Sequence, residues 1–231
     1  MPNVPESCAD HYVFWQVHRT PVQVAPVKLK EQFQPETYDS GILWNVDFLG
    51  NPATKRRPDR EEEDVHHPSV HLLAYTIEKP RPGPPGPILI RNQFTGPEGA
   101  RWEVGPCRYL LVPARKTRPP EAPPTTPPLP RVDHFVCYEA NGPEVDQFSS
   151  PVDQFGVTDI NRMWPKFLGV PADKQGEGII HPDVHLAIYE VERGVEQEVV
   201  VNTADQFRRL ELRSIRSVFF GVPSFKEWRR G

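Results

Sequence analysis

Histidines are the residues whose type and spacing most readily suggest chemistry in this 231-residue sequence. Two segments bring His and Asp close together along the chain, and their candidate metal ligands are His67, His71, His181, Asp183 and His185. Neutral imidazoles and a carboxylate suit zinc or another transition metal. However, Pro68 and Pro182 favour a loop that leads into a strand, whereas a His-x-x-x-His pair shares one face only on a helix. A metal-dependent enzyme is therefore the least favoured of three hypotheses.

Signals for other kinds of catalysis are missing from the sequence. There is no Gly-x-Ser-x-Gly elbow and no glycine-rich phosphate loop. Cys137 lies close to His134, but both belong to an expected strand, where successive side chains point to opposite faces. We predict no catalytic residue and no cofactor.

Tryptophans offer a second kind of site, one that binds rather than reacts. Four of them do not recur at one position of the repeats described below, and they are Trp44, Trp102, Trp164 and Trp228. Such rings suit contacts with a sugar or a protein partner, although ordinary packing in a core is the favoured explanation for them. A carbohydrate-binding or small-ligand-binding β module is therefore the alternative hypothesis for function.

The elements that must position these residues form four repeats. Each repeat starts with His and an apolar run, continues to a Gln-Phe pair, and ends with the pattern aromatic-x-x-x-Pro-x-x-Lys. The repeated histidines are His11, His71, His134 and His185, and the repeated lysines are Lys55, Lys116, Lys174 and Lys226. A residue that recurs in every unit is best explained by something that every unit needs, such as a hydrogen bond that closes a strand end.

Within each repeat the pattern is typical of short strands. Apolar residues alternate with polar ones, as in residues 185–191, and Gly and Pro interrupt them at short intervals. We predict an all-β fold with about three strands in each repeat. We expect two tandem small β-barrel or sandwich domains, each an internal duplication, with a four-bladed, propeller-like ring as the alternative.

A proline-rich segment predicts where the two domains divide. Residues 117–130 hold seven prolines, which is typical of a semi-rigid linker. The first domain then covers residues 1–116 and the second covers residues 131–231. The four repeats, numbered 1 to 4 below, cover about residues 10–55, 66–116, 132–174 and 180–226.

Charge and hydropathy exclude two classes of function. The formal net charge is −4, and no stretch approaches the ~18 apolar residues of a membrane helix. We therefore expect no nucleic-acid partner and no transmembrane segment. The first ten residues also lack the basic and apolar regions of a signal peptide.

Several motifs together resemble a known family. They are Asp133-His134-Phe135-Val136-Cys137-Tyr138, Asp153-Gln154-Phe155 and Phe167-Leu168-Gly169-Val170-Pro171-Ala172-Asp173-Lys174. They resemble an uncharacterised bacterial β-repeat family, a domain of unknown function that is common in exported multi-repeat proteins. The resemblance implies a repeat-built fold and no particular activity. It also implies a disulfide between a strand cysteine and a turn cysteine, but the turn positions here are Gly50, Leu111, Gly169 and Gly221.

The favoured hypothesis for function is a non-catalytic structural or protein-interaction protein, an accessory or assembly subunit of a larger complex. Its partner would be another protein or further copies of itself. The reasons are that scaffold positions repeat four times and that no site signature is confined to one repeat. Exposed strand edges of small β domains offer one way to pair with another chain.

Overall fold

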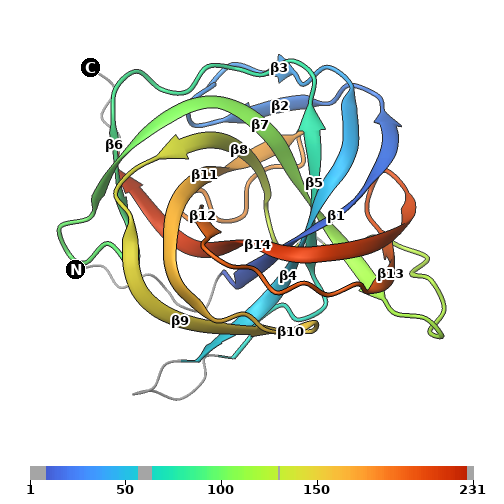
Figure 1. The fold of residues 1–231 in the computed structure, drawn as a ribbon. Coiled ribbons are helices and arrows are strands. Elements are labelled where there is room, and N and C mark those ends of the chain that lie inside the picture. The colour runs from blue at the N-terminus through green and yellow to red at the C-terminus, as the bar shows by residue number, and fades with distance from the viewer. Residues whose placement is uncertain (1–8, 57–63, 130, 228–231) are drawn as a thin grey trace.

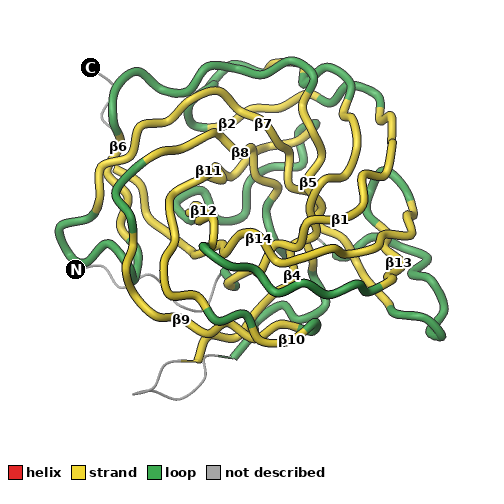
Figure 2. Tube along the Cα trace, viewed as in Figure 1, coloured by secondary structure: helices red, strands yellow, loops and turns green. Residues whose placement is uncertain are grey.

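The computed structural model of the chain describes residues 9–56, 64–129 and 131–227, and within them it contains strands and no helix (Figures 1 and 2). The all-β prediction is confirmed. The strands are β1 (His11–Val24), β2 (Lys28–Glu31), β3 (Tyr38–Asp39), β4 (Leu43–Arg56), β5 (His71–Ile77), β6 (Ile88–Arg91), β7 (Ala100–Thr117), β8 (His134–Asn141), β9 (Val145–Asp153), β10 (Gly156–Val157), β11 (Ile160–Lys174), β12 (His185–Val191), β13 (Val200–Ala204) and β14 (Arg209–Glu227).

Eight of these strands pair side by side into a closed ring, which can be followed in Figure 1. Their order is β1, β4, β5, β7, β8, β11, β12 and β14, after which β14 pairs with β1 again, and every pairing is antiparallel. Each repeat supplies two neighbouring ring strands. One starts at the repeated histidine and the other ends near the repeated lysine.

The expectation of two separate small barrels or sandwiches is not met by this pairing. β7, from the first predicted domain, pairs with β8 from the second, and β1 pairs with β14. The physical reason is that the ring strands of two repeats would leave two long unpaired edges, and the other two repeats satisfy both. The four repeats thus form a ring, as in the alternative, but as one continuous sheet rather than separate blades. The domain boundaries and the internal duplication stay predictions.

Four outer strands tie each repeat to the opposite repeat of the ring. β2 of repeat 1 pairs with the end of β11 in repeat 3, and β9 of repeat 3 pairs with the end of β4 in repeat 1. In the same way β6 of repeat 2 pairs with β14, and β13 of repeat 4 pairs with β7. Every repeat is therefore held by two neighbours in the ring and by the repeat across it.

The inside of the ring is filled by aromatic side chains. Phe48, Tyr109, Phe167 and Phe219, the first residues of the four aromatic-x-x-x-Pro-x-x-Lys motifs, contact one another in a closed circuit. Neighbouring ring centroids lie 5.0 to 5.5 Å apart at interplanar angles of 69° to 88°, which is edge-to-face packing. The four aromatic rings therefore pack together inside the ring of strands, with Phe167 and Phe219 buried and Phe48 and Tyr109 half-buried.

Two glycines of these motifs make room for that core. A Cβ atom on Gly50 would lie 2.8 Å from the ring of Phe14, and one on Gly221 would lie 2.9 Å from it. No side chain fits at either distance, so glycine is required where β4 and β14 approach Phe14 from both sides.

The opposite face of the ring strands packs under the outer strands, so both faces are buried. Residues 71–75 of β5, for example, are all buried, and the same holds for residues 185–189 of β12. Strands covered on both faces carry continuous apolar runs, which explains the His-apolar runs of the repeats.

Candidate functional site

Repeated polar residues meet under the outer strands in four equivalent clusters. In each, an aromatic residue of one repeat hydrogen-bonds to the residue that precedes Gln-Phe in the opposite repeat. The four pairs are Trp15 with Asp153 (2.6 Å), Tyr138 with Glu31 (2.8 Å), Tyr189 with Asn92 (2.9 Å) and Tyr75 with Asp205. The phenylalanine of each Gln-Phe pair then packs edge-on against that aromatic ring, with centroids 5.1 to 5.8 Å apart.

The same acid or amide also fixes the turn that carries the phenylalanine. The backbone N–H of Phe33 donates to Glu31 at 2.6 Å, and that of Phe155 donates to Asp153 at the same distance. The corresponding bonds to Asn92 and Asp205 measure 2.9 and 2.7 Å. Burial raises the pKa of the three carboxyl groups, while these hydrogen bonds oppose the rise. All four residues therefore serve the fold.

Lysines of the repeats lie over the same phenylalanine rings. The Nζ atoms of Lys116, Lys226 and Lys174 are 4.2, 4.5 and 5.5 Å from the ring centroids of Phe155, Phe33 and Phe207, respectively. Burial lowers the pKa of Lys116 to about 7 and that of Lys226 to about 8. Such contacts between a cation and a ring are favourable when the cation is desolvated.

Three of the repeated histidines, His71, His134 and His185, are buried beside these lysines. Burial, followed by the charge of Lys174, lowers the pKa of His134 to about 4, and burial with Lys226 lowers that of His185 to about 3. Nδ1 of His71, Nε2 of His134 and Nε2 of His185 are buried without a hydrogen-bond partner. These imidazoles are held neutral inside the fold, which fits the structural role that recurrence suggested.

The five candidate metal ligands do not come together. Among the residues that the structure describes, no three His, Cys, Asp or Glu side chains are placed to hold a metal ion. His67 instead lies with Nδ1 3.3 Å from Oδ2 of Asp10. His71 and His185 start β5 and β12 in opposite repeats, and Nδ1 of His185 lies 3.1 Å from the backbone oxygen of Asp183.

Two aspartates that the sequence reasoning missed organise the His-rich segments. Asp10 accepts hydrogen bonds from the backbone N–H groups of His66 and His67, at 2.6 and 2.9 Å. Asp133 does the same for Ile180 and His181, at 2.6 and 2.8 Å. The signal was present in the sequence, since Asp precedes the repeated histidine in repeats 1 and 3 alone. These segments are tied loops that lead into strands.

The predicted contact tryptophans occupy different environments. Trp44 is 37% exposed, Trp164 is half-buried, and Trp228 lies outside the described residues. Trp102 is only 1% exposed, and its ring packs at 89° to that of Tyr189 with centroids 5.4 Å apart. A partner could reach the ring of Trp44 directly, whereas Trp102 belongs to the core.

Trp102 nevertheless reaches the wall of a surface pocket of about 370 Å³. The pocket lies between the loop that joins β6 to β7 and the turn that joins β8 to β9. Its wall includes the aromatic residues Phe94, Trp102 and Tyr189 and the polar residues Thr95, Arg101 and Glu144. Pockets of this size hold small organic ligands.

Two cysteines lie on opposite faces of the ring strands. Cys137 packs with the side chains inside the ring, and Cys107 packs under the outer strands, so both are buried and free. Burial raises the pKa of both thiols, which leaves them in the unreactive protonated form.

A comparison with protein-family models matches residues 71–223 to a repeat of unknown function, DUF7450. The chain belongs to this family. The match extends from the start of β5 into β14 and covers more than half of the chain. The DUF7450 match confirms the expected membership of an uncharacterised repeat family. Comparisons with curated proteins and with solved structures found no match.

The DUF7450 match covers three of the four polar-cluster residues that precede Gln-Phe, namely Asn92, Asp153 and Asp205. It also covers both sides of the pocket at Trp102. Within the residues that the structure describes, no helix is long and apolar enough to cross a membrane.

Proposed function

We propose that the protein is a non-catalytic structural or protein-interaction protein, an accessory or assembly subunit whose partner is another protein or a further copy of itself. One observation supports this proposal most strongly: the repeated side chains that could bind a ligand or react contact one another instead. The carboxyl groups hold turns and aromatic side chains, and the lysines lie over phenylalanine rings. Residues occupied in this way build a scaffold, so the specific function belongs to its surface.

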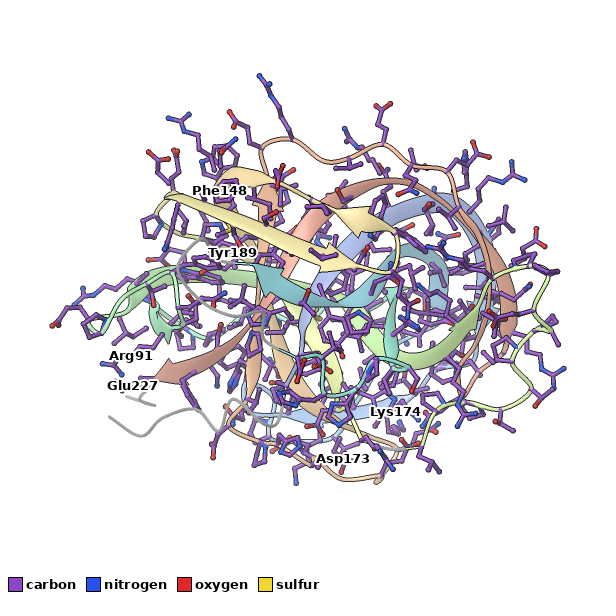
Figure 3. All side chains as sticks on the ribbon, turned by 90° about the horizontal axis from the view of Figure 1, so that it is seen from below. Arg91, Phe148, Asp173, Lys174, Tyr189 and Glu227 are labelled. Carbon is purple, nitrogen blue, oxygen red and sulfur yellow. The ribbon has the colours of Figure 1, made fainter. Side chains whose placement is uncertain are left out.

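The surface around β9 and β10 supports an interaction role. Phe148 on β9, which is labelled in Figure 3, is 50% exposed, and Val157 on β10 is 43% exposed. β10 ends the path of strands in the sheet, so one of its edges has no partner among the strands that the structure describes. Val195 is also exposed, and its backbone N–H donates to Ser217, whose hydroxyl lies 3.4 Å from that of Thr158. Exposed apolar side chains next to a strand edge are suited to pairing with another chain.

Native mass spectrometry tests this proposal on protein purified gently from its own source and on recombinant protein over a range of concentrations. We expect a defined homo-oligomer or a stable complex with a second chain. Phe148→Ser combined with Val157→Ser should release the partner, whereas Ile180→Ser should retain it, because Ile180 is 46% exposed but lies in the segment before β12. A monomer in every preparation, or equal effects of both variants, would contradict the proposal.

A second candidate function, a small-ligand-binding β module, is favoured by the pocket at Trp102. Its aromatic and charged wall residues are typical of sites that orient a ligand by a few polar contacts. We also propose, from the resemblance alone, the bacterial and exported setting of the family.

A further inference from the structure

The proline-rich stretch of the sequence lies in the connection between β7 and β8, which covers residues 118–133 and holds seven prolines. These two strands pair directly, with Leu111 opposite Phe135, so the connection joins neighbours within one sheet. The equivalent connection between β11 and β12, residues 175–184, has six fewer residues and only one proline. Joining two ring strands therefore explains neither the length of this connection nor its prolines.

The first part of the connection is tied to the fold. The hydroxyl of Thr117 donates to the backbone oxygen of Ala122 at 3.0 Å, and Nη2 of Arg209 donates to the backbone oxygen of Thr125 at 3.0 Å. Pro124 is buried. In Figure 1 the connection is the yellow-green loop beside β13. These contacts hold the base of the loop, so the residues that follow Thr125 start from a fixed place.

Residues 126–129, which follow, are turned to solvent. Thr126 and Pro127 are exposed, and Pro128 is half-buried. Leu129 is 63% exposed, the highest value among the exposed large apolar side chains of the described residues. Within the same part of the chain, no hydrogen bond involves these four residues. Their backbone oxygens can therefore accept hydrogen bonds from another molecule.

The sequence favours one backbone conformation for these four residues. Proline fixes φ at about −65° and favours an extended backbone in the residue before it. Two of the four residues are prolines, and residues 126, 127 and 129 each precede a proline. Residues 127–129 belong to no helix, strand or turn. The expected conformation is polyproline II, which has no internal hydrogen bonds and loses little conformational entropy on binding.

A positive charge follows this apolar segment. Arg131 is exposed, and it forms no ion pair in the described part of the chain. Proteins that recognise polyproline II do so with grooves lined by aromatic side chains. An acidic side chain beside such a groove would pair with the guanidinium of Arg131.

We propose that residues 126–129 are a polyproline II docking segment for another protein. The partner has a groove lined by aromatic side chains, which takes Pro127 and Leu129, and an acidic residue beside it, which pairs with Arg131. This proposal goes beyond the interaction role argued above, because it uses a different surface from β9 and β10 and does not depend on that surface.

Purified SH3, WW and EVH1 domains are defined probes for the segment, because each has an aromatic-lined groove for proline-rich chains. Each domain is labelled with ¹⁵N and titrated with the full, unlabelled chain, and NMR reports which of its residues are affected. We expect at least one domain of the panel to bind saturably, with the shifted signals confined to its aromatic groove. The proposal is overturned if no domain binds, or if the shifts lie outside the groove.

Matched variants locate the binding on this chain. Pro127→Ala and Leu129→Ser should each weaken binding at least about tenfold, because side chains that fill a groove carry most of the binding energy of an interface. Arg131→Gln should weaken it several-fold. Pro85→Ala changes an exposed proline between β5 and β6 and should leave binding unchanged. Equal effects of Pro85→Ala and Pro127→Ala, or full binding by Leu129→Ser, would overturn the proposal.

The variant Phe148→Ser combined with Val157→Ser separates this proposal from the previous one. It should bind the probe domain as tightly as the parent, because both changes lie on β9 and β10. Loss of probe binding in this variant would place the docking site at β9 and β10 and contradict the role of residues 126–129.

Discussion

The three carboxylate clusters and the Asn92 cluster occupy equivalent places around the ring, yet they bury different chemistry. Asp153 accepts four hydrogen bonds, from Trp15, Asn51 and the backbone N–H groups of residues 155 and 156. Asn92 accepts one bond at its side-chain oxygen and donates two from its amide nitrogen. The comparison shows that the fold needs a polar side chain at this position but not a charged one. We call this residue, which precedes Gln-Phe in each repeat, the hub of its cluster. The pocket of about 370 Å³ lies beside the Asn92 cluster, which is the one without a carboxyl group.

The largest effect should come from removing the two hubs. Asp153→Ala leaves three part-buried donors and the exposed N–H of residue 156 without their acceptor and takes from Lys116 the negative charge that favours its protonated form, so we expect a loss of about 3–5 kcal/mol in the free energy of unfolding. Asn92→Ala breaks fewer bonds and exposes no charge, and we expect about 1–3 kcal/mol. Urea unfolding followed by circular dichroism measures both.

The exposed Asp146→Ala variant is the control for these two and should change stability by less than about 0.5 kcal/mol. If Asp153→Ala does not fold, Asp153→Asn provides the milder comparison, since it keeps the shape and removes the charge. Equal costs at Asp153 and Asn92 would show that charge at the hub has no energetic role.

A smaller effect is expected from pH at two of the repeated histidines, His134 and His185. Nδ1 of His134 lies 4.0 Å from Oε2 of Glu177, and that carboxylate partly offsets the lowering of the histidine's pKa. The pKa of His185 is lowered by burial and by the charge of Lys226, and no carboxylate opposes this effect. NMR titration should therefore show both histidines gaining their protons well below pH 6.5, with His185 doing so at the lower pH. A reversed order would contradict the assigned role of Glu177.

Burial of neutral His185 should make the folded protein less stable as the pH decreases. The folded-state pKa of His185 lies below the ordinary value of 6.5, so the unfolded chain binds the proton first and stability falls as pH decreases from about 6.5 towards 3. In His185→Gln the loss of stability between pH 7 and pH 4 should be smaller than in the parent by about 2–3 kcal/mol. His18→Gln, at an exposed histidine, should keep the parent's loss.

The smallest effect on stability should come from Asn92→Asp, which converts the fourth cluster to the chemistry of the others. The O–H of Tyr189 would then donate to the new carboxylate, so we expect a change below about 1 kcal/mol. Urea unfolding followed by circular dichroism measures the change, and a loss as large as that of Asn92→Ala would contradict this expectation.

The fold class and the recurring positions could be predicted from sequence because they depend on local patterns. The His-apolar runs, the Gln-Phe pairs and the aromatic-x-x-x-Pro-x-x-Lys motifs each reflect something that every repeat needs in its backbone or core. Their partners could not be predicted. Tyr138 bonds to Glu31 across 107 residues, and Trp15 bonds to Asp153 across 138. A repeated sequence shows which residues are equivalent, but it does not show that each one meets the opposite repeat.

The candidate site shows the same limit. Trp102 was singled out because it stands outside the repeated positions, and it does line a pocket, but from within the core. Arg101 and Glu144 carried no signal, since single exposed charges are common on any surface. The sequence does show that Asn92 is the one amide among the four residues that precede Gln-Phe. Its hydrogen bonds to Tyr189 and Ser224 could be found only from the structure.

The pairing of β1 with β14 has a consequence for the time at which the protein can fold. The first strand of the ring closes against the last, so this contact spans almost the whole chain. Contacts between distant segments slow folding, because a large loop must close before the contact stabilises anything. During synthesis, β1 cannot pair with β14 until β14 has left the ribosome. Until then one edge of β1 is unpaired and can bind to other chains.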